Sequence, residues 1–271
     1  MITIIFGGVG VGKTKLLTKI ACDKMVFSAR EDIAKLRKEI NTLNFGGFNL
    51  SFNQKHLVFS DYEIIAKDMG VIPRKSHYVS GFYVGLPNSQ HKTLFLPPYS
   101  SVFFSEGQKY FNSRMSAYFS DFVSRFYETH RHYGVNIFID CQRPKLIDLN
   151  IRELAEEFIE VLSTKDYYKK GVIVKSTWEC RVFKSNQSVE KYLTSGDTTD
   201  CEYRTYKHIG NIFNCYDSHY FKFLNYKDRY ERNFDIVPSP IVEFNIESIK
   251  NLNELYNCEV PRTFYTKRSA K

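Results

Sequence analysis

The chain has 271 residues and lacks any apolar stretch long enough to cross a bilayer, which takes about 20 residues. The apolar run at residues 2–6 is too short for a signal peptide. The six cysteines include no Cys-x-x-Cys pair, and no Cys and His spacing is typical of a zinc site. Reduced thiols in a cytosolic protein are therefore expected. Internal repeats and low-complexity tracts are also missing, which argues against a repeat architecture.

The composition that remains is that of an ordinary soluble globular protein, 43% hydrophobic and 25% charged. The length fits one large α/β domain, or one such domain with a smaller one appended. The net charge of +8 is compatible with a nucleic acid or an acidic membrane surface as partner. It is equally compatible with a solvated basic surface that an acidic partner or a neighbouring subunit balances, so charge alone does not decide.

A glycine-rich motif follows the first apolar run. Residues 7–14 have the spacing G-x-x-x-x-G-K-[ST], between a predicted strand and a predicted helix. Glycines let several backbone N–H groups point at one phosphate, and the helix N-terminus adds partial positive charge. Lys13 is placed to reach the β- and γ-phosphates, and Thr14 to ligate Mg²⁺. The motif predicts a site for ATP and Mg²⁺ lined by Gly7, Gly8, Val9, Gly10, Val11, Gly12, Lys13, Thr14 and Lys15.

Strands and helices alternate over the first 163 residues, which predicts a mostly parallel central sheet flanked by helices. The expected strands are 2–6, 56–59, 101–104, 135–140 and 158–162, and the expected helices are 13–27, 31–43, 108–132 and 151–160. Residues 70–98 contain four prolines and are expected to be turn-rich. Farther on, strand-like segments at 172–183 and 203–213 precede a basic tail. We expect two units, a nucleotide-binding core at 1–163 and a smaller β-rich C-terminal region at 164–271.

Hydrolysis needs an acidic group and a group that positions water in addition to the loop. Two predicted strands end in such acids, one in Ser105-Glu106 and the other in Asp140. If Glu106 activates water, Gln142 becomes the polar sensor of the γ-phosphate, and both lie where α/β sheets bind ligands. Ser105 then replaces the usual Asp and offers a hydroxyl to a magnesium-bound water. If Asp140 is the magnesium acid, Glu106 has no catalytic role. The first interpretation is favoured, and a helix-capping role for Glu106 is also open.

A His-Arg-His block ends the predicted helix at residues 130–132, just before Gly134. One explanation is the favourable placement of cations at a helix C-terminus. The other is that Arg131 faces the nucleotide of a neighbouring subunit as an arginine finger. Arg143 and Arg152 compete for that role, and the sequence does not decide among the three.

Together these segments resemble one family. The phosphate loop, Ser-Glu-Gly-Gln at 105–108, the block Phe-Tyr-Glu-Thr-His-Arg-His-Tyr-Gly at 126–134 and Cys-Gln at 141–142 are similar to the zonular occludens toxin-like (Zot) P-loop ATPases of filamentous phages. Two later segments, 148–152 and 212–218, also resemble the family. The resemblance implies an additional-strand P-loop NTPase fold, related to FtsK/HerA-type motors. The candidate catalytic residues are Lys13, Glu106, Gln142 and Arg131, and the candidate metal ligands are Thr14, Ser105 and Glu106.

The resemblance further implies a hexameric ATPase at the cytoplasmic face of the host inner membrane. Such an ATPase drives phage assembly and the extrusion of phage DNA, together with other assembly proteins. This sequence departs from the family in two ways. Ser105 stands where Asp is usual, which leaves a nucleotide-binding scaffold with little hydrolysis as an alternative. The usual transmembrane helix is missing, so membrane association would be peripheral and through a partner; its absence also fits a DNA-packaging ATPase of an icosahedral virus.

Overall fold

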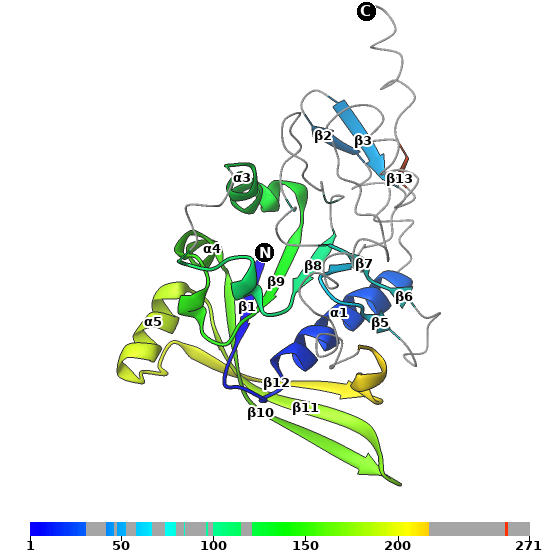
Figure 1. Cartoon of the computed structure of the whole chain (residues 1–271), viewed down its shortest axis with the longest axis vertical. Coiled ribbons are helices and arrows are strands. Elements are labelled where there is room, and N and C mark those ends of the chain that lie inside the picture. The colour runs from blue at the N-terminus through cyan, green and yellow to red at the C-terminus, as the bar shows by residue number, and fades with distance from the viewer. Residues whose placement is uncertain are drawn as a thin grey trace, which may run out of the picture.

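An eight-stranded sheet forms the centre of the molecule (Figure 1). The computed structural model describes residues 1–30, 42–45, 48–52, 58–66, 74–79, 84, 96, 100–114, 121–216 and 258–259. The strands lie in the order β12-β11-β10-β1-β9-β8-β4-β7. Their bounds are β1 (Ile2–Phe6), β4 (Val58–Ser60), β7 (His77–Tyr78), β8 (Ser101–Phe104), β9 (Asn136–Asp140), β10 (Glu157–Lys169), β11 (Val172–Phe183) and β12 (Cys201–Ile209). In this order, each strand from β10 to β7 is parallel to the next one. Strand β11 is antiparallel to both of its neighbours, β10 and β12.

Helices and short 3₁₀ turns connect these strands. The helices are α1 (Lys13–Arg30), α3 (Asp121–Thr129), α4 (Leu149–Leu154) and α5 (Asn186–Ser195). The 3₁₀ turns are η1 (Gly107–Lys109), η3 (His130–Tyr133), η4 (Pro144–Leu146) and η5 (Ile212–Asn214). Two small antiparallel sheets accompany the main one: β5 (Ile65–Ala66) pairs with β6 (Arg74–Lys75), and β3 (Phe48–Phe52) lies between β2 (Thr42–Phe45) and β13 (Cys258–Glu259).

The sheet has an apolar layer on each face, because successive strand residues point to opposite sides. Ile2 and Ile4 of β1 belong to a cluster that also contains buried side chains of α3, α4 and α5. Ile5 belongs to the opposite cluster, which contains Leu16 and Leu17 of α1. The sheet is therefore sandwiched between α1 on one face and α3, α4 and α5 on the other. Apolar burial on both faces explains why its central strands are continuous hydrophobic runs.

The mostly parallel sheet expected from the sequence is confirmed. The helix expected at 108–132 is wrong in its first part. Residues 107–109 form only a 3₁₀ turn, and Asn112 makes an isolated bridge to Ile147. Residues 115–120 lie outside the described residues. The helix expected at 151–160 is wrong in its second half, because α4 ends at Leu154 and pairing with β1 draws the following residues into β10.

Other expectations have mixed outcomes. The sequence did not indicate helix α5, which begins after Ser185, whose side chain accepts a hydrogen bond from the N–H of Ser188. Residues 31–41, most of the segment 70–98 and the basic tail lie outside the described part of the chain. Thr42 and Leu43, expected at the end of a helix, lie in strand β2.

The unit boundary expected between residues 163 and 164 falls inside strand β10. The N-terminal part of this strand pairs with β1, and its whole length pairs with β11. The C-terminal strands β11 and β12 therefore extend the core sheet instead of forming a sheet of their own. Strand β10 brings residues on both sides of the expected boundary beside the loop that follows β1.

Candidate functional site

The glycine-rich loop joins the C-terminal end of β1 to the start of α1. Its backbone curls tightly: Gly12 has φ +91°, and a Cβ there would lie 2.5 Å from Oγ1 of Thr164. Glycine is therefore required at this position on two counts. The ammonium of Lys13 donates to the carbonyl oxygen of Gly8 at 2.6 Å and so lies across the loop. Helix α1 begins at Lys13, which directs its N-terminal N–H groups at the space that the loop encloses.

Strands β10 and β11 hold the loop in this shape. The hydroxyl of Thr164 donates to the carbonyl oxygen of Val11 at 2.6 Å. The indole N–H of Trp178, which is fully buried, donates to the carbonyl oxygen of Gly12 at 3.3 Å. These bonds satisfy loop carbonyls and leave the loop N–H groups available to an anion. Thr164 and Trp178 fall in the unit expected at 164–271, and only the extension of the core sheet brings them here.

A carboxylate from β9 faces the loop. Oδ2 of Asp140 accepts a hydrogen bond from the hydroxyl of Thr14 at 2.7 Å, and Oδ1 accepts one from the N–H of Glu106 at 2.6 Å. The side chain is buried, which raises its pKa to about 6, and the two hydrogen bonds oppose that rise. Asp140 thus links the phosphate loop to the end of β8. The acid that touches Thr14 comes from the strand whose acid was the less favoured alternative in the sequence.

Glu106 stands at the end of β8 in a left-handed conformation, with φ +49° and ψ +51°. Such a conformation is uncommon for a non-glycine residue and is typical of functional turns. The side chain of Glu106 is exposed and lines the same cavity as Lys13. Ser105 is buried, and its N–H donates to Oδ1 of the buried Asp61, whose Oδ2 pairs with Lys109 at 2.7 Å. Ser105 is not among the residues that line the cavity.

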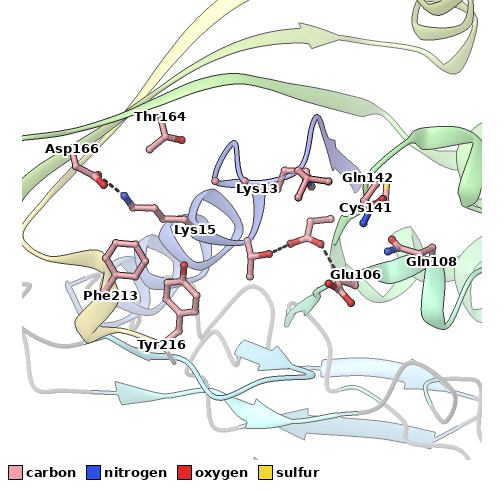
Figure 2. A pocket seen from close by; sticks show the side chains of 15 residues that line it. Lys13, Lys15, Glu106, Gln108, Cys141, Gln142, Thr164, Asp166, Phe213 and Tyr216 are labelled. Atoms are coloured by element: carbon pink, nitrogen blue, oxygen red, sulfur yellow. Dashed lines mark hydrogen bonds and ion pairs between the residues drawn. The ribbon is translucent and has the colours of Figure 1, made fainter. Parts of the chain in front are cut away.

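The cavity has a volume of about 450 Å³, a size typical of small-ligand pockets, and it has two distinct ends (Figure 2). Glu106, Gln108, Asp140, Cys141 and Gln142 lie at one end, from β8, η1 and β9. The phosphate loop with Lys13 lies in the middle. Thr164, Asp166, Phe213 and Tyr216 lie at the other end, with Lys15 between them and the loop. An elongated, anionic ligand would have its charged end at the loop and its other end toward the aromatic rings.

The aromatic end is built around the ammonium of Lys15. Lys15 is buried and forms an ion pair with Oδ1 of Asp166, which also accepts a hydrogen bond from Ser176 at 2.6 Å. The same ammonium lies 4.7 Å from the ring centroid of Phe213, which stacks on Tyr216 with centroids 6.0 Å apart. Phe213 remains 42% exposed although it is a large apolar side chain. No motif in the sequence predicts this end of the cavity, and the alternation of Thr164 and Asp166 along one strand is the only signal for it.

Two glutamines lie at the end of the cavity that contains Glu106 and Asp140. Gln142 follows β9, is exposed and lines the cavity, and its role as a sensor stays a prediction. Gln108 lines the cavity as well, and its Oε1 is buried without a hydrogen-bond partner among the described residues. A buried amide oxygen without a partner is costly, so Gln108 has acceptor capacity to offer a ligand or a water molecule. In the sequence, Gln108 stands out only as part of a motif that resembles the Zot-like family.

The three candidate arginines lie in different surroundings. Arg131 is exposed and pairs with Glu156 at 3.1 Å, close to the N-terminal ends of the strands and away from the phosphate loop of its own chain. Arg143 is exposed beside Gln142. Arg152 is buried: it donates to the carbonyl oxygen of Ile147 at 3.1 Å and pairs with Glu190 at 2.8 Å. Arg152 thus joins α4 to α5, and a role in a neighbouring site stays a prediction for Arg131.

The donors beside the loop fit a magnesium ion that a nucleotide brings with it. Mg²⁺ prefers oxygen ligands, and P-loop sites supply few of them from the protein, the rest being phosphate oxygens and water. Thr14 supplies a hydroxyl and Asp140 a carboxylate in contact with it. Among the described residues, no group of three or more His, Cys, Asp and Glu side chains could hold a metal by itself. The site therefore fits Mg²⁺ held jointly by protein and nucleotide.

Strand order and loop together define the class of this protein. Strand β9 lies between β1, which leads into the phosphate loop, and β8, which leads into Glu106. A parallel sheet with one extra strand between these two is the additional-strand form of the P-loop NTPase fold. The chain has this fold, with α1 on one face and the antiparallel strands β11 and β12 added at one edge.

Comparison with solved structures finds proteins of related architecture. The chain is similar to the N-terminal domain of zonular occludens toxin from Neisseria meningitidis, at 19% identity and a TM-score of 0.43 over 80% of this chain and 98% of that one. It is also similar to the genome packaging NTPase B204 of Sulfolobus turreted icosahedral virus 2, at 11% identity and a TM-score of 0.35 over 75% and 96% of the two chains. A third is the flagellar accessory protein FlaH from Methanocaldococcus jannaschii, at 14% identity and a TM-score of 0.32 over 74% and 83%.

Two further comparisons found no relative: no protein-family model and no curated protein matches the chain. The assignment of the fold therefore rests on the strand order and on the loop. Within the described part of the chain, no helix is long and apolar enough to cross a membrane.

Proposed function

We propose that the chain binds ATP with Mg²⁺ in the cavity at the phosphate loop and hydrolyses it. The observation that carries this proposal is the pair of hydrogen bonds that Asp140 accepts from Thr14 and from the backbone of Glu106. These hydrogen bonds connect the phosphate loop to β9, which carries Asp140, and to the end of β8, which carries Glu106. They place the buried carboxylate of Asp140 and the exposed side chain of Glu106 beside the proposed anion-binding loop.

The residues take the following roles in the proposal. Loop N–H groups and Lys13 hold the β- and γ-phosphates, and bound Mg²⁺ would neutralise charge that develops on them. Thr14 and Asp140 would hold the ion, and Asp140 takes the place of Ser105, which was the ligand expected from the sequence but is buried outside the cavity. Glu106, whose carboxylate is exposed in the cavity, orients and polarises the attacking water. Gln142 contacts the γ-phosphate, and Gln108 is a second candidate for that contact.

The base of the nucleotide lies at the aromatic end in this arrangement. Phe213 offers an exposed ring, and rings of this kind stack on the flat face of any base. Asp166 also lines this end of the cavity, where Lys15 and Ser176 donate to its Oδ1. The proposed nucleotide is ATP, which is the substrate that the resemblance to Zot-like P-loop ATPases implies.

We further propose that ATP turnover drives phage assembly and DNA extrusion in a homo-oligomeric, hexameric ring, with Arg131 contacting the nucleotide of a neighbouring subunit. The resemblance of the motifs at 105–108, 126–134 and 141–142 to those of Zot-like ATPases supports this role. The exposed position of Arg131, remote from its own phosphate loop, is compatible with a contact to another subunit. The expected site of action is the host cytoplasm, at the inner face of the membrane, through a membrane-bound partner.

The proposal is tested by Lys13→Ala with ATP binding and phosphate release as readouts. Lys13→Ala removes the cation from the loop, so ATP binding should weaken and phosphate release should fall to background. Lys184→Ala is the matched control, because Lys184 is an exposed lysine that pairs with Glu157 away from the cavity. Full phosphate release by Lys13→Ala would contradict the mechanism.

A second candidate function is a nucleotide-dependent scaffold that binds ATP and turns it over little. The position of Ser105 favours it, because this residue is buried outside the cavity and brings no carboxylate to the end of β8. ATP binding without phosphate release, in the presence of single-stranded DNA, would select this candidate. Association of the chain with an empty icosahedral capsid would instead favour a DNA-packaging motor.

A further inference from the structure

The extended strands β10, β11 and β12 have one face that α5 covers only in part. Near the body of the sheet, Tyr192 of α5 stacks on Phe183 and contacts Arg181 at 2.6 Å. Beyond this region the hairpin of β10 and β11 extends past α5 (Figure 1). The distal part of this face includes the exposed side chains of Lys165, Tyr167, Lys207 and Ile209. The opposite face of the same strands packs on the phosphate loop through Thr164, Asp166 and Trp178.

Strand register determines which side chains share the distal part of this face. Tyr167 pairs with Lys175, which pairs with Ile209 of β12. In the next row, Lys165 pairs with Thr177, which pairs with Lys207. Directly opposed residues on neighbouring strands point to the same side of a sheet. We call these side chains the outer face; they are Lys165, Tyr167, Lys175, Thr177, Lys207 and Ile209.

The outer face is cationic and carries a tyrosine between two lysines. The ammonium groups of Lys165 and Lys175 lie 5.3 Å and 4.9 Å from the ring centroid of Tyr167. Tyr167, Lys165 and Lys207 are all exposed. Residues 167–178 contain three lysines and no aspartate or glutamate. The acid that precedes them, Asp166, points to the opposite face and pairs with Lys15. Glu179 occupies the following row, and this marks the end of the cationic region.

We propose that the outer face binds single-stranded nucleic acid. An accessible aromatic ring stacks on a base, and flanking lysines neutralise phosphates on either side of it, which is the chemistry of single-strand binding surfaces. Lys165, Lys175 and Lys207 lie on three neighbouring strands and so form a cationic track across the sheet. A duplex would meet the same charges, but its stacked bases offer no free face to Tyr167. An acidic protein would pair with the lysines without requiring the ring.

The outer face lies on the same β-strand as part of the nucleotide site. Along β10, Thr164 and Asp166 point toward the phosphate loop, and Lys165 and Tyr167 point to the outer face. The bound nucleic acid and the bound nucleotide would therefore lie on opposite sides of β10. This inference extends the proposed function but does not require ATP hydrolysis, so we test it without nucleotide.

The test measures binding of a fluorescent oligothymidylate of about 20 nucleotides by anisotropy over a range of salt concentrations. The variant Lys165→Gln, Lys175→Gln, Lys207→Gln should bind at least tenfold more weakly. The slope of the logarithm of its binding constant against the logarithm of salt concentration should also be shallower by about 2. Each phosphate contact on a single strand contributes about 0.7 to that slope, and three lysines are removed. The variant Tyr167→Ala should bind about fivefold or more weakly, and Tyr167→Phe should bind like the parent protein.

The matched control is Lys184→Gln, Lys191→Gln, which removes exposed lysines paired with Glu157 and Asp197 outside the outer face. This control should retain both affinity and salt dependence. Unchanged urea midpoints and unchanged ATP binding would show that the outer-face variants remain folded with an intact nucleotide site. The proposal is overturned if the lysine variant binds oligothymidylate like the parent. It is also overturned if duplex DNA binds as tightly as single strands and Tyr167→Ala has no effect, or if the variants alter only the oligomeric mass in light scattering.

Discussion

Thr14 and Asp140 are joined by a hydrogen bond of 2.7 Å between the start of α1 and the end of β9. The two residues are far apart in sequence, and the bond exists because β9 lies directly beside β1 in the sheet. It places a buried carboxylate next to the hydroxyl that is expected to hold magnesium. The same carboxylate accepts a hydrogen bond from the backbone N–H of Glu106. Binding of an ion at Thr14 would therefore affect the backbone at the end of β8.

Asp140→Asn should weaken the magnesium dependence of nucleotide binding. Asparagine can still accept a hydrogen bond from Thr14, but it removes the negative charge, and changes of this kind cost on the order of 10- to 100-fold in metal affinity. Titration of Mg²⁺ at a fixed nucleotide concentration measures the shift. Asp200→Asn, at an exposed carboxylate, should leave the titration unchanged. An unshifted curve for Asp140→Asn would exclude this residue from the ion site.

Phe213→Leu should weaken ATP binding about fivefold or more, because base stacking on an aromatic ring is worth about 1–3 kcal/mol. Inorganic tripolyphosphate, which has no base, should compete equally well for the parent and the variant. Isothermal titration with both ligands separates the two effects. Equal losses for ATP and tripolyphosphate would show that Phe213 supports the phosphate loop and does not contact the base.

Gly107→Ala should destabilise the fold and disturb the site. A Cβ at Gly107 would lie 2.1 Å from Cγ2 of Ile139, so η1 and β9 could no longer approach closely, at a cost of about 1–3 kcal/mol. Gly171→Ala is the control, since Gly171 has φ +76° with nothing within 4 Å, and only backbone strain of about 1 kcal/mol is expected. Urea unfolding measures both. A smaller loss for Gly107→Ala than for Gly171→Ala would argue against the close contact.

His130→Gln should make stability less dependent on pH between about 7 and 5. Burial lowers the pKa of His130 below its value in the unfolded chain, and its Nε2 has no partner among the described residues. The unfolded state therefore binds more protons, and stability is lost as pH falls through the unfolded pKa, by at most about 1.4 kcal/mol per pH unit. Urea midpoints at several pH values test this. His208, whose pKa is also lowered by burial, should preserve part of the slope.

The sequence allowed the parallel core of the fold and the phosphate loop to be predicted, and left the aromatic end of the cavity unpredicted. Residues 7–14 predict a phosphate loop by themselves, because spacing and glycine content are properties of one short segment. Phe213 and Asp166 carry no such local signal. They reach the cavity only because β10 continues beyond residue 163 and η5 packs beside α1.

The sequence by itself determined that a phosphate loop lies between a buried strand and a helix, because hydrophobic runs and glycine spacing act over a few residues. Tertiary structure alone decided which acid meets Thr14, since that depends on which strand lies next to β1. It also decided that the hairpin of β10 and β11 belongs to the core sheet, so that one face of it supports the loop and α5 contacts the other near the body of the sheet. Strand pairing is a long-range contact, and a single sequence does not reveal which strands become neighbours.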